Sequence, residues 1–249
     1  MYNDEKRTYL NDYEEMSMPG SSRMQQLSMS EAFPILMRKV YTWMALALVI
    51  TGFTAYYVAT TPSLLSLIYS NQVVLWGLII GELALVIGLS AAINRLSLTT
   101  ATLLFVLYSV LNGAMLSSVF LIYTTASIAN VFFITAGTFG AMAAYGYFTK
   151  KDLTSWGRIL LMALIGIIIA SVVNIFLRNS MFDLVISYIG VAIFVGLTAY
   201  DSQKIKEMML QAPDASEQAQ KIALLGALTL YLDFINLFLY LLRIFGKRE

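Results

Sequence analysis

Seven long apolar runs, each close to 20 residues, dominate this chain of 249 residues. A helix needs about 20 apolar residues to cross the hydrocarbon core of a bilayer. Only short polar breaks separate the runs, so the chain has no room for a soluble catalytic domain. We therefore predict an all-α, polytopic membrane protein with seven transmembrane helices. The predicted spans are Val40–Ala59, Val73–Ile93, Leu98–Ile122, Ile128–Phe148, Ile159–Phe176, Leu184–Tyr200 and Ile222–Leu242.

Composition narrows the chemistry that these helices can carry. Hydrophobic residues make up 59% and charged residues 12%, about half the charged fraction of a soluble domain. The net charge of +1 provides no general attraction to nucleic acid. The absence of Cys excludes thiol chemistry and thiolate metal sites, and the absence of His removes the usual general base. The remaining carboxylates, hydroxyls and amides suit protons and hard cations, so we predict neither an enzyme nor a bound cofactor.

The N-terminal segment differs from the rest of the chain. Residues 1–30 are polar and contain no apolar region of a signal peptide. We predict a disordered cytoplasmic tail over residues 1–30 and a membrane domain over residues 31–249. Ser28 and Glu31 have the spacing of a capping box, where we expect the first helix to begin. Pro34 fits an early turn of that helix, and all four prolines lie outside the predicted spans, so we expect largely unbroken helices.

The basic residues predict the orientation. Seven crossings place the C-terminus opposite the N-terminus, although Arg243, Lys247 and Arg248 near the end favour a re-entrant last segment. We favour seven full spans because Ile222–Leu242 is long enough to cross. The positive-inside rule places the N-terminus in the cytoplasm. On that side lie Arg38, Lys39, Arg95, Lys150, Lys151, Arg158, Lys204, Lys206 and Lys221, whereas the opposite loops hold only Arg178.

Asp233 is a carboxylate in the middle of the last apolar run. An unpaired Asp at membrane depth costs roughly 2.5–3.5 kcal/mol on insertion scales, so it needs a partner or a function. It belongs to a polar stripe that must face protein or water rather than lipid. The alternative is a structural role, although an amide or hydroxyl would supply that without the cost of a charge. The stripe spans an arc of about 80° and contains Thr229, Asp233, Asn236, Tyr240 and Arg243.

Asp201 is a second acid of interest, at the end of the sixth predicted span. Alone it is typical of a solvated charge at a helix end, with Lys204 as a neighbour one turn away. It meets Asp233 only if the sixth helix sits deeper or the seventh begins before the membrane. Two carboxyl groups in a dry site would share a proton and titrate together. Such a pair is a pH sensor and, in its charged form, a cation site.

Glu82 is a third acid, in the middle of the second predicted span. It is either a functional carboxylate or a protonated, hydrogen-bonded packing residue. Arg95, after the same span, is an available cation for a carboxylate on the cytoplasmic side, or only a positive-inside anchor. The candidate hydrogen-bond partners of Glu82 are Ser109, Asn112, Ser117 and Asn174.

At these residues the chain resembles the Bax inhibitor-1 (transmembrane Bax inhibitor motif) family. The similar segments are Leu230–Phe238, Gly196–Ile205 and, more weakly, Thr149–Leu153, and the resemblance covers roughly residues 35–246. It implies a seven-helix fold in which the other six helices surround the last, central helix.

The same resemblance implies a pH-sensitive calcium leak. Two aspartates near the cytoplasmic side form a hydrogen-bonded pair that controls opening, and their positions match Asp201 and Asp233, which become candidate Ca²⁺ ligands. An Arg of the second helix acts as a latch in the family, and Arg95 is the nearest match. Glu82 resembles an acid that could line the pore, and Asn236 is a further candidate beside the pair.

Two alternatives belong to other classes of protein. Some members of the family are described as non-transporting regulators that bind membrane proteases or cell-death factors. An intramembrane aspartyl protease would use Tyr200 and Asp201, but Asp233 lacks the Gly-x-Gly-Asp context and no predicted span contains the proline of a Pro-Ala-Leu element. We expect an integral protein of a bacterial cytoplasmic membrane. Its expected partners are the lipid bilayer, Ca²⁺ or another cation, and membrane proteins, but no nucleic acid.

Overall fold

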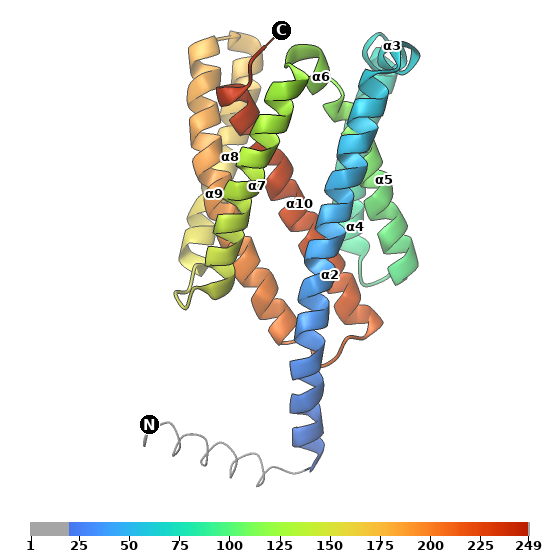
Figure 1. The fold of residues 1–249 in the computed structure, drawn as a ribbon, viewed down its shortest axis with the longest axis vertical. Coiled ribbons are helices and arrows are strands. Elements are labelled where there is room, and N and C mark those ends of the chain that lie inside the picture. The colour runs from blue at the N-terminus through green and yellow to red at the C-terminus, as the bar shows by residue number, and fades with distance from the viewer. Residues whose placement is uncertain (1–19, 249) are drawn as a thin grey trace.

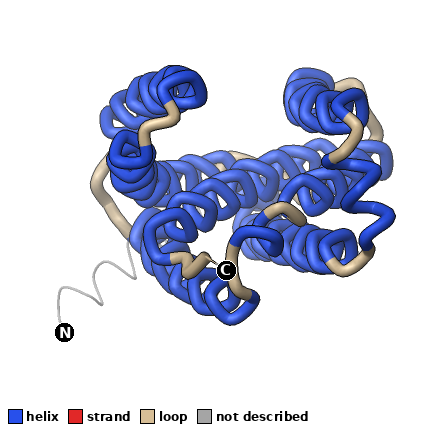
Figure 2. Tube along the Cα trace, turned by 90° about the horizontal axis from the view of Figure 1, so that it is seen from above, coloured by secondary structure: helices blue, strands red, loops and turns tan. Residues whose placement is uncertain are grey.

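The computed structural model describes residues 20–248, and the side chains of residues 31–248. The described residues are helices joined by loops (Figure 2), with one isolated backbone bridge. Seven helical segments are long and apolar enough to cross a membrane, which confirms the predicted class. In chain order the helices are α2 (Gly20–Ala59), α3 (Pro62–Tyr69), α4 (Gln72–Ala92), α5 (Leu98–Leu116), α6 (Val119–Ile122), α7 (Thr125–Phe148), α8 (Thr154–Leu177), α9 (Ser180–Leu210) and α10 (Glu217–Phe245).

The last helix, α10, runs through the centre of the bundle (Figure 1). Within the described residues, 67% of an 18-residue apolar stretch of α10 is buried inside the protein. The corresponding share is 6% for α4 and for α8. Helices α2, α5, α7 and α9 pack directly against α10, whereas α4 packs mainly on α5 and α8 on α9. The central last helix is confirmed, with four helices in immediate contact and two on the outer flanks. A helix with a polar stripe must be enclosed by protein, while uniformly apolar helices can face lipid.

The helix bundle has two ends, the N-side and the C-side. The N-side holds the loops 93–97, 149–153 and 211–216, and α2 enters the bundle there (Figure 1). The C-side is the opposite end, with helix α3 and the loops 60–61, 70–71, 123–124 and 178–179.

The chain end lies on the C-side. Arg248 forms an antiparallel bridge with Tyr123, and the backbone N–H of Thr124 donates to the Lys247 carbonyl at 3.1 Å. The N–H of Lys247 donates to the Ser127 hydroxyl at 2.8 Å. Because this loop joins the third and fourth spans, the last helix crosses the whole bundle rather than re-entering.

The beginning of the first helix differs from the prediction. Helix α2 begins at Gly20, so Ser28 and Glu31 do not start it, and Pro34 lies inside it. Of the predicted tail, residues 1–19 lie outside the described residues, and residues 20–30 belong to α2. The capping-box spacing is a local signal that also occurs inside helices. Pro34 removes one backbone donor, which a long and otherwise continuous helix tolerates here.

Helices α9 and α10 extend well beyond their apolar runs. The predicted break over residues 201–221 is helical up to Leu210 and again from Glu217. Lys204, Lys206 and Glu207 are good helix formers, so α9 continues after its apolar pattern ends. Asp201 therefore lies inside α9, nine residues before its end, rather than at a helix terminus.

The third span is interrupted, although it contains no proline. Between α5 and α6 the hydroxyl of Ser117 donates to the Ala114 carbonyl at 2.6 Å, and that of Ser118 to the Met115 carbonyl at 3.1 Å. The Tyr69 hydroxyl donates to the same Met115 carbonyl at 2.9 Å and accepts from the Ser118 N–H at 3.1 Å. The largely unbroken helices that the sequence predicts have an exception here, because serine hydroxyls compete for backbone carbonyls and Tyr69 satisfies the groups that the break frees.

Close packing of α7 on α9 generates a testable prediction. A Cβ at Gly146 would overlap the backbone carbonyl of Ala199, which cannot rotate away, whereas a Cβ at Gly140 on the same helix would meet no atom within 4 Å. We expect Gly146→Ala to lower the free energy of unfolding by about 1–3 kcal/mol. Thermal unfolding in detergent checks this, with Gly140→Ala as the matched control. Equal melting temperatures for the two variants would contradict the packing described here.

Candidate functional site

The candidate site is a pair of carboxyl groups on two neighbouring helices. Asp201 of α9 and Asp233 of α10 face each other at hydrogen-bonding distance. Asp233 is only 4% exposed and Asp201 is half-buried. Within the described residues, no N–H or O–H group donates to Oδ2 of Asp233. Two carboxyl groups can form a hydrogen bond only if one of them carries a proton, so this arrangement is suited to hold one shared proton.

Helix geometry explains how two short side chains reach each other. Both helices extend past the apolar runs, so Asp201 and Asp233 come to the same level. Two glycines bring the helix axes close on either side of the pair. A Cβ at Gly190 would overlap the ring of Tyr240, and a Cβ at Gly226 would lie 3.1 Å from Ile205. Small residues of this kind allow membrane helices to approach closely.

Polar contacts fix the position of α9 around Asp201. The hydroxyl of Ser202, the next residue, donates to the Ala143 carbonyl of α7 at 2.8 Å and lies 3.3 Å from the Tyr41 hydroxyl of α2. Lys204 lies one turn further along α9, exposed, with its ammonium group 5.7 Å from the centre of the Tyr200 ring. It is a cation close enough to interact with Asp201. The pair is thus enclosed by α2, α7, α9 and α10.

Three lysines tie helices together at the N-side of the pair. Lys39 of α2 donates to the side chain of Gln220 on α10. Lys206 of α9 donates to the Tyr147 carbonyl at the end of α7, at 2.7 Å. Lys221 of α10, 7% exposed, donates to the Leu96 carbonyl at 3.0 Å. These bonds join the N-side ends of the helices.

The other predicted residues lie further from the pair. Arg95 is exposed in the loop after α4 and makes no hydrogen bond or ion pair with Asp201 or Asp233 in the described structure. Lys221 is the buried cation at that loop. Asn236 donates to the Leu232 carbonyl of its own helix at 2.8 Å rather than to the pair. The roles of Arg95 as a latch and of Asn236 as a pore residue stay predictions.

The polar stripe of α10 faces protein, as predicted. Thr229 donates to its own helix, to the Leu225 carbonyl at 3.1 Å. Tyr240 packs against Phe194 of α9, with ring centres 5.9 Å apart. Arg243 lies 3.7 Å from Asp183 at the start of α9. Asp183 is therefore part of a half-exposed ion pair.

A second polar network lies on the opposite face of α10. Glu82 of α4 is hydrogen-bonded to Asn112 of α5, one of its four predicted partners. The hydroxyl of Tyr231 lies 3.0 Å from Asn112 Oδ1 and 2.7 Å from the Thr51 hydroxyl, which donates to the Ser109 carbonyl at 2.9 Å. Tyr231 is completely buried. The sequence did not reveal the role of Tyr231, because a tyrosine in an apolar run looks like any other residue of a hydrophobic core.

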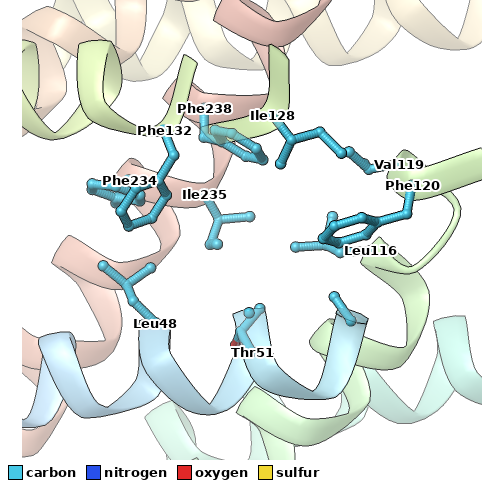
Figure 3. Close-up of a pocket in the computed structure, with 12 residues that line it drawn as sticks. Leu48, Thr51, Leu116, Val119, Phe120, Ile128, Phe132, Phe234, Ile235 and Phe238 are labelled. Atoms are coloured by element: carbon cyan, nitrogen blue, oxygen red, sulfur yellow. The ribbon is translucent and has the colours of Figure 1, made fainter. Parts of the chain in front are cut away.

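An apolar cavity of about 90 Å³ lies beyond the pair toward the C-side. Figure 3 shows side chains from α2, α5, α6, α7 and α10 pointing into it. Its single hydroxyl, on Thr51, is already hydrogen-bonded. A cation in this cavity would lose water without gaining ligands, so the cavity itself is not a cation site. The cavity is lined by Leu48, Thr51, Gly52, Ala55, Leu116, Val119, Phe120, Ile128, Phe132, Phe234, Ile235 and Phe238.

Comparisons with known proteins show the family of this chain. The model of the family described as "Inhibitor of apoptosis-promoting Bax1" matches residues 34–249. The chain is 55% identical to the inner membrane protein YbhL of Escherichia coli K12, over 86% of this chain and 92% of that protein. It is 48% identical to a protein of Borreliella burgdorferi, over 85% of this chain and 91% of that protein. A protein of Deinococcus radiodurans is 40% identical, over 91% of this chain and 98% of its own length.

The Tyr231 network generates a second prediction. Tyr231→Phe removes the hydroxyl that Thr51 and Asn112 share, and leaves buried polar groups without that partner. We expect a loss of about 1–3 kcal/mol in the free energy of unfolding, measured as a lower melting temperature in detergent. Tyr240→Phe is the control, because the Tyr240 hydroxyl makes no hydrogen bond within the described residues. A Tyr231→Phe variant as stable as the control would show that the network contributes nothing.

Proposed function

The chain belongs to the family of inhibitors of apoptosis-promoting Bax1, and from that premise we propose that it is a pH-sensitive cation leak channel. Calcium is the proposed ion, and the coupled pair of Asp201 and Asp233 is the proposed gate. The observation that carries the proposal is the contact of two acids inside a membrane bundle. A structural bond between α9 and α10 would need no charge, because amides or hydroxyls would make it at lower cost.

The protonation state of the pair supplies the switch. With one proton, the two carboxyl groups attract each other and hold α9 against α10. When that proton leaves, two negative charges in a poorly solvated site repel each other. The same two charges then attract a cation from solution. We therefore propose that rising pH separates the helices and opens the site.

The small number of protein ligands at the pair favours conduction of Ca²⁺ over its tight binding. Ca²⁺ takes six to eight oxygen ligands in tight protein sites, and Asp201 and Asp233 supply only carboxylate oxygens from two residues. Within the described residues, no three acidic side chains gather in a metal-binding arrangement. A site with few protein ligands leaves water on the ion, so the ion can depart again, as conduction requires.

Opening also requires movement of α10. Phe234, Ile235 and Phe238 follow Asp233 along that helix and line the apolar cavity of Figure 3. Repulsion at the pair would displace α10 from α9 and carry these side chains with it. Glu82, hydrogen-bonded at the opposite face, is a proposed second carboxylate of the path.

We place the protein in the bacterial inner membrane, with its N-terminus in the cytoplasm. The relative from Escherichia coli is named an inner membrane protein. The N-side loops carry most of the basic residues, which favours that side as cytoplasmic. On this orientation the acid pair senses cytoplasmic pH.

Calcium flux tests the proposed function. In liposomes that contain a calcium dye, we expect the purified protein to pass Ca²⁺ faster than empty liposomes do, with a rate that rises as pH rises. The reason is the loss of the shared proton. A flux equal to that of empty liposomes at every pH would contradict the channel and favour the alternative of a non-transporting regulator of membrane proteins.

Two variants separate gating from structural hydrogen bonding. Asp233→Asn keeps the size of the side chain but cannot ionise, so we expect its flux to lose most of its dependence on pH. Asn236→Ala, one turn away on the same stripe, removes a hydrogen bond to its own helix and should leave the pH dependence intact. Equal and negligible effects of the two substitutions would indicate that the pair only holds helices together.

A further inference from the structure

A groove runs between α7 and α8 near the N-side, and its lining does not include Asp201 or Asp233. Both helices pack on α9, and a cavity of about 450 Å³ lies between them. Its floor consists of the small residues Ala192, Gly196 and Ala199 of α9. Its walls include the aromatic side chains of Tyr145, 47% exposed, and Trp156, 64% exposed. The bottom of the groove is thus apolar, and the groove opens at the surface of the bundle.

Positive charge gathers at the N-side mouth of this groove. Lys151 lines the mouth, and the exposed side chains of Lys150 and Arg158 flank it in sequence. Lys204 of α9 lies over the ring of Tyr200, which also lines the groove. Lys151 thus lines one end of the groove, and Arg158 and Lys204 lie next to two residues of its lining, Asp152 and Tyr200.

One acid, Asp152, opposes these cations. Its carboxylate accepts a hydrogen bond from the Thr154 N–H at 2.8 Å. The hydroxyl and the N–H of Thr154 hold the pKa of Asp152 below its ordinary value, with a smaller contribution from Arg158. Asp152 therefore stays ionised but is engaged by the first turn of α8. The net charge at the mouth of the groove therefore remains positive.

The basic loop is held rigidly at the end of the groove. The side-chain amide of Gln203 on α9 donates to the Lys151 carbonyl at 2.8 Å and accepts from the Leu153 N–H at 2.9 Å. Gln203 and Leu153 are buried. These two hydrogen bonds hold the loop in one position without a ligand. A loop that is already ordered lowers the entropic cost of binding.

We propose that this groove binds one anionic phospholipid of the N-side leaflet. An acyl chain would lie along the small-residue floor, and the phosphate and headgroup would meet Lys151, Arg158 and Lys204. Tyr145 and Trp156 stand at the interfacial level that aromatic residues favour in membranes. The positive mouth complements an anionic headgroup and favours a zwitterionic one less. The proposal does not depend on the channel function.

Quenching of Trp156 by brominated lipids tests this site. Trp43→Phe with Trp76→Phe leaves Trp156 as the only tryptophan of the chain. In phosphatidylcholine vesicles with a small fraction of brominated lipid, we expect brominated phosphatidylglycerol to quench Trp156 as if enriched about five-fold or more over brominated phosphatidylcholine. Equal quenching by the two lipids would overturn the proposal.

Three controls make the result specific. A chain that keeps only Trp76, which is 59% exposed on α4 in a segment of residues 60–94 without Lys or Arg, should be quenched equally by both lipids. Lys151→Gln combined with Arg158→Gln should abolish the preference at Trp156. A preference that persists in that variant, or that Trp76 shares, would indicate general enrichment around the protein and overturn the site. In the otherwise unchanged chain, Trp156→Phe should remove the phosphatidylglycerol-specific part of the quenching.

Discussion

The contact between Asp201 and Asp233 is the constraint on which the rest of this structure depends. A single carboxylate in the middle of a membrane span is expensive, and the second acid gives it a hydrogen-bonding partner. The contact requires α9 and α10 to extend beyond the apolar runs, so that the two residues reach one level. It also requires glycines on either side, at Gly190 and Gly226, where larger residues would separate the helices. The central position of α10 follows, because its polar stripe must be enclosed by protein.

Helix α10 makes a second set of polar contacts on its other face. Tyr231, two residues before Asp233, connects it to Thr51 of α2 and Asn112 of α5, and through Asn112 to Glu82 of α4. The acid pair thus faces α9 while the tyrosine network faces the other half of the bundle. Any displacement of α10 that separates the pair must strain or rearrange this network. Polar contacts on two faces of α10 thus link its position to α9 on one side and to α2 and α5 on the other.

The sequence was sufficient for the class, the seven spans and the inward stripe, because apolar length and helical spacing are direct physical signals. It could not place Asp201, since polar helix formers continue α9 past the apolar pattern to Leu210. The break at Ser117 was also hidden, because it depends on Tyr69 from a distant helix. Arg95 and Lys221 are both cations at the same loop, and only tertiary packing buries Lys221 and leaves Arg95 exposed.

Infrared spectroscopy of the carboxyl groups tests the shared proton most directly. A protonated carboxyl absorbs apart from a carboxylate, and Glu82→Gln removes the contribution of the other buried acid. In that background at neutral pH, we expect one protonated carboxyl that disappears when Asp201 and Asp233 are both replaced by Asn. Its titration should accompany the change in calcium flux. A pair with no protonated carboxyl, or with two, over the pH range in which flux changes would contradict a gate that works by sharing one proton.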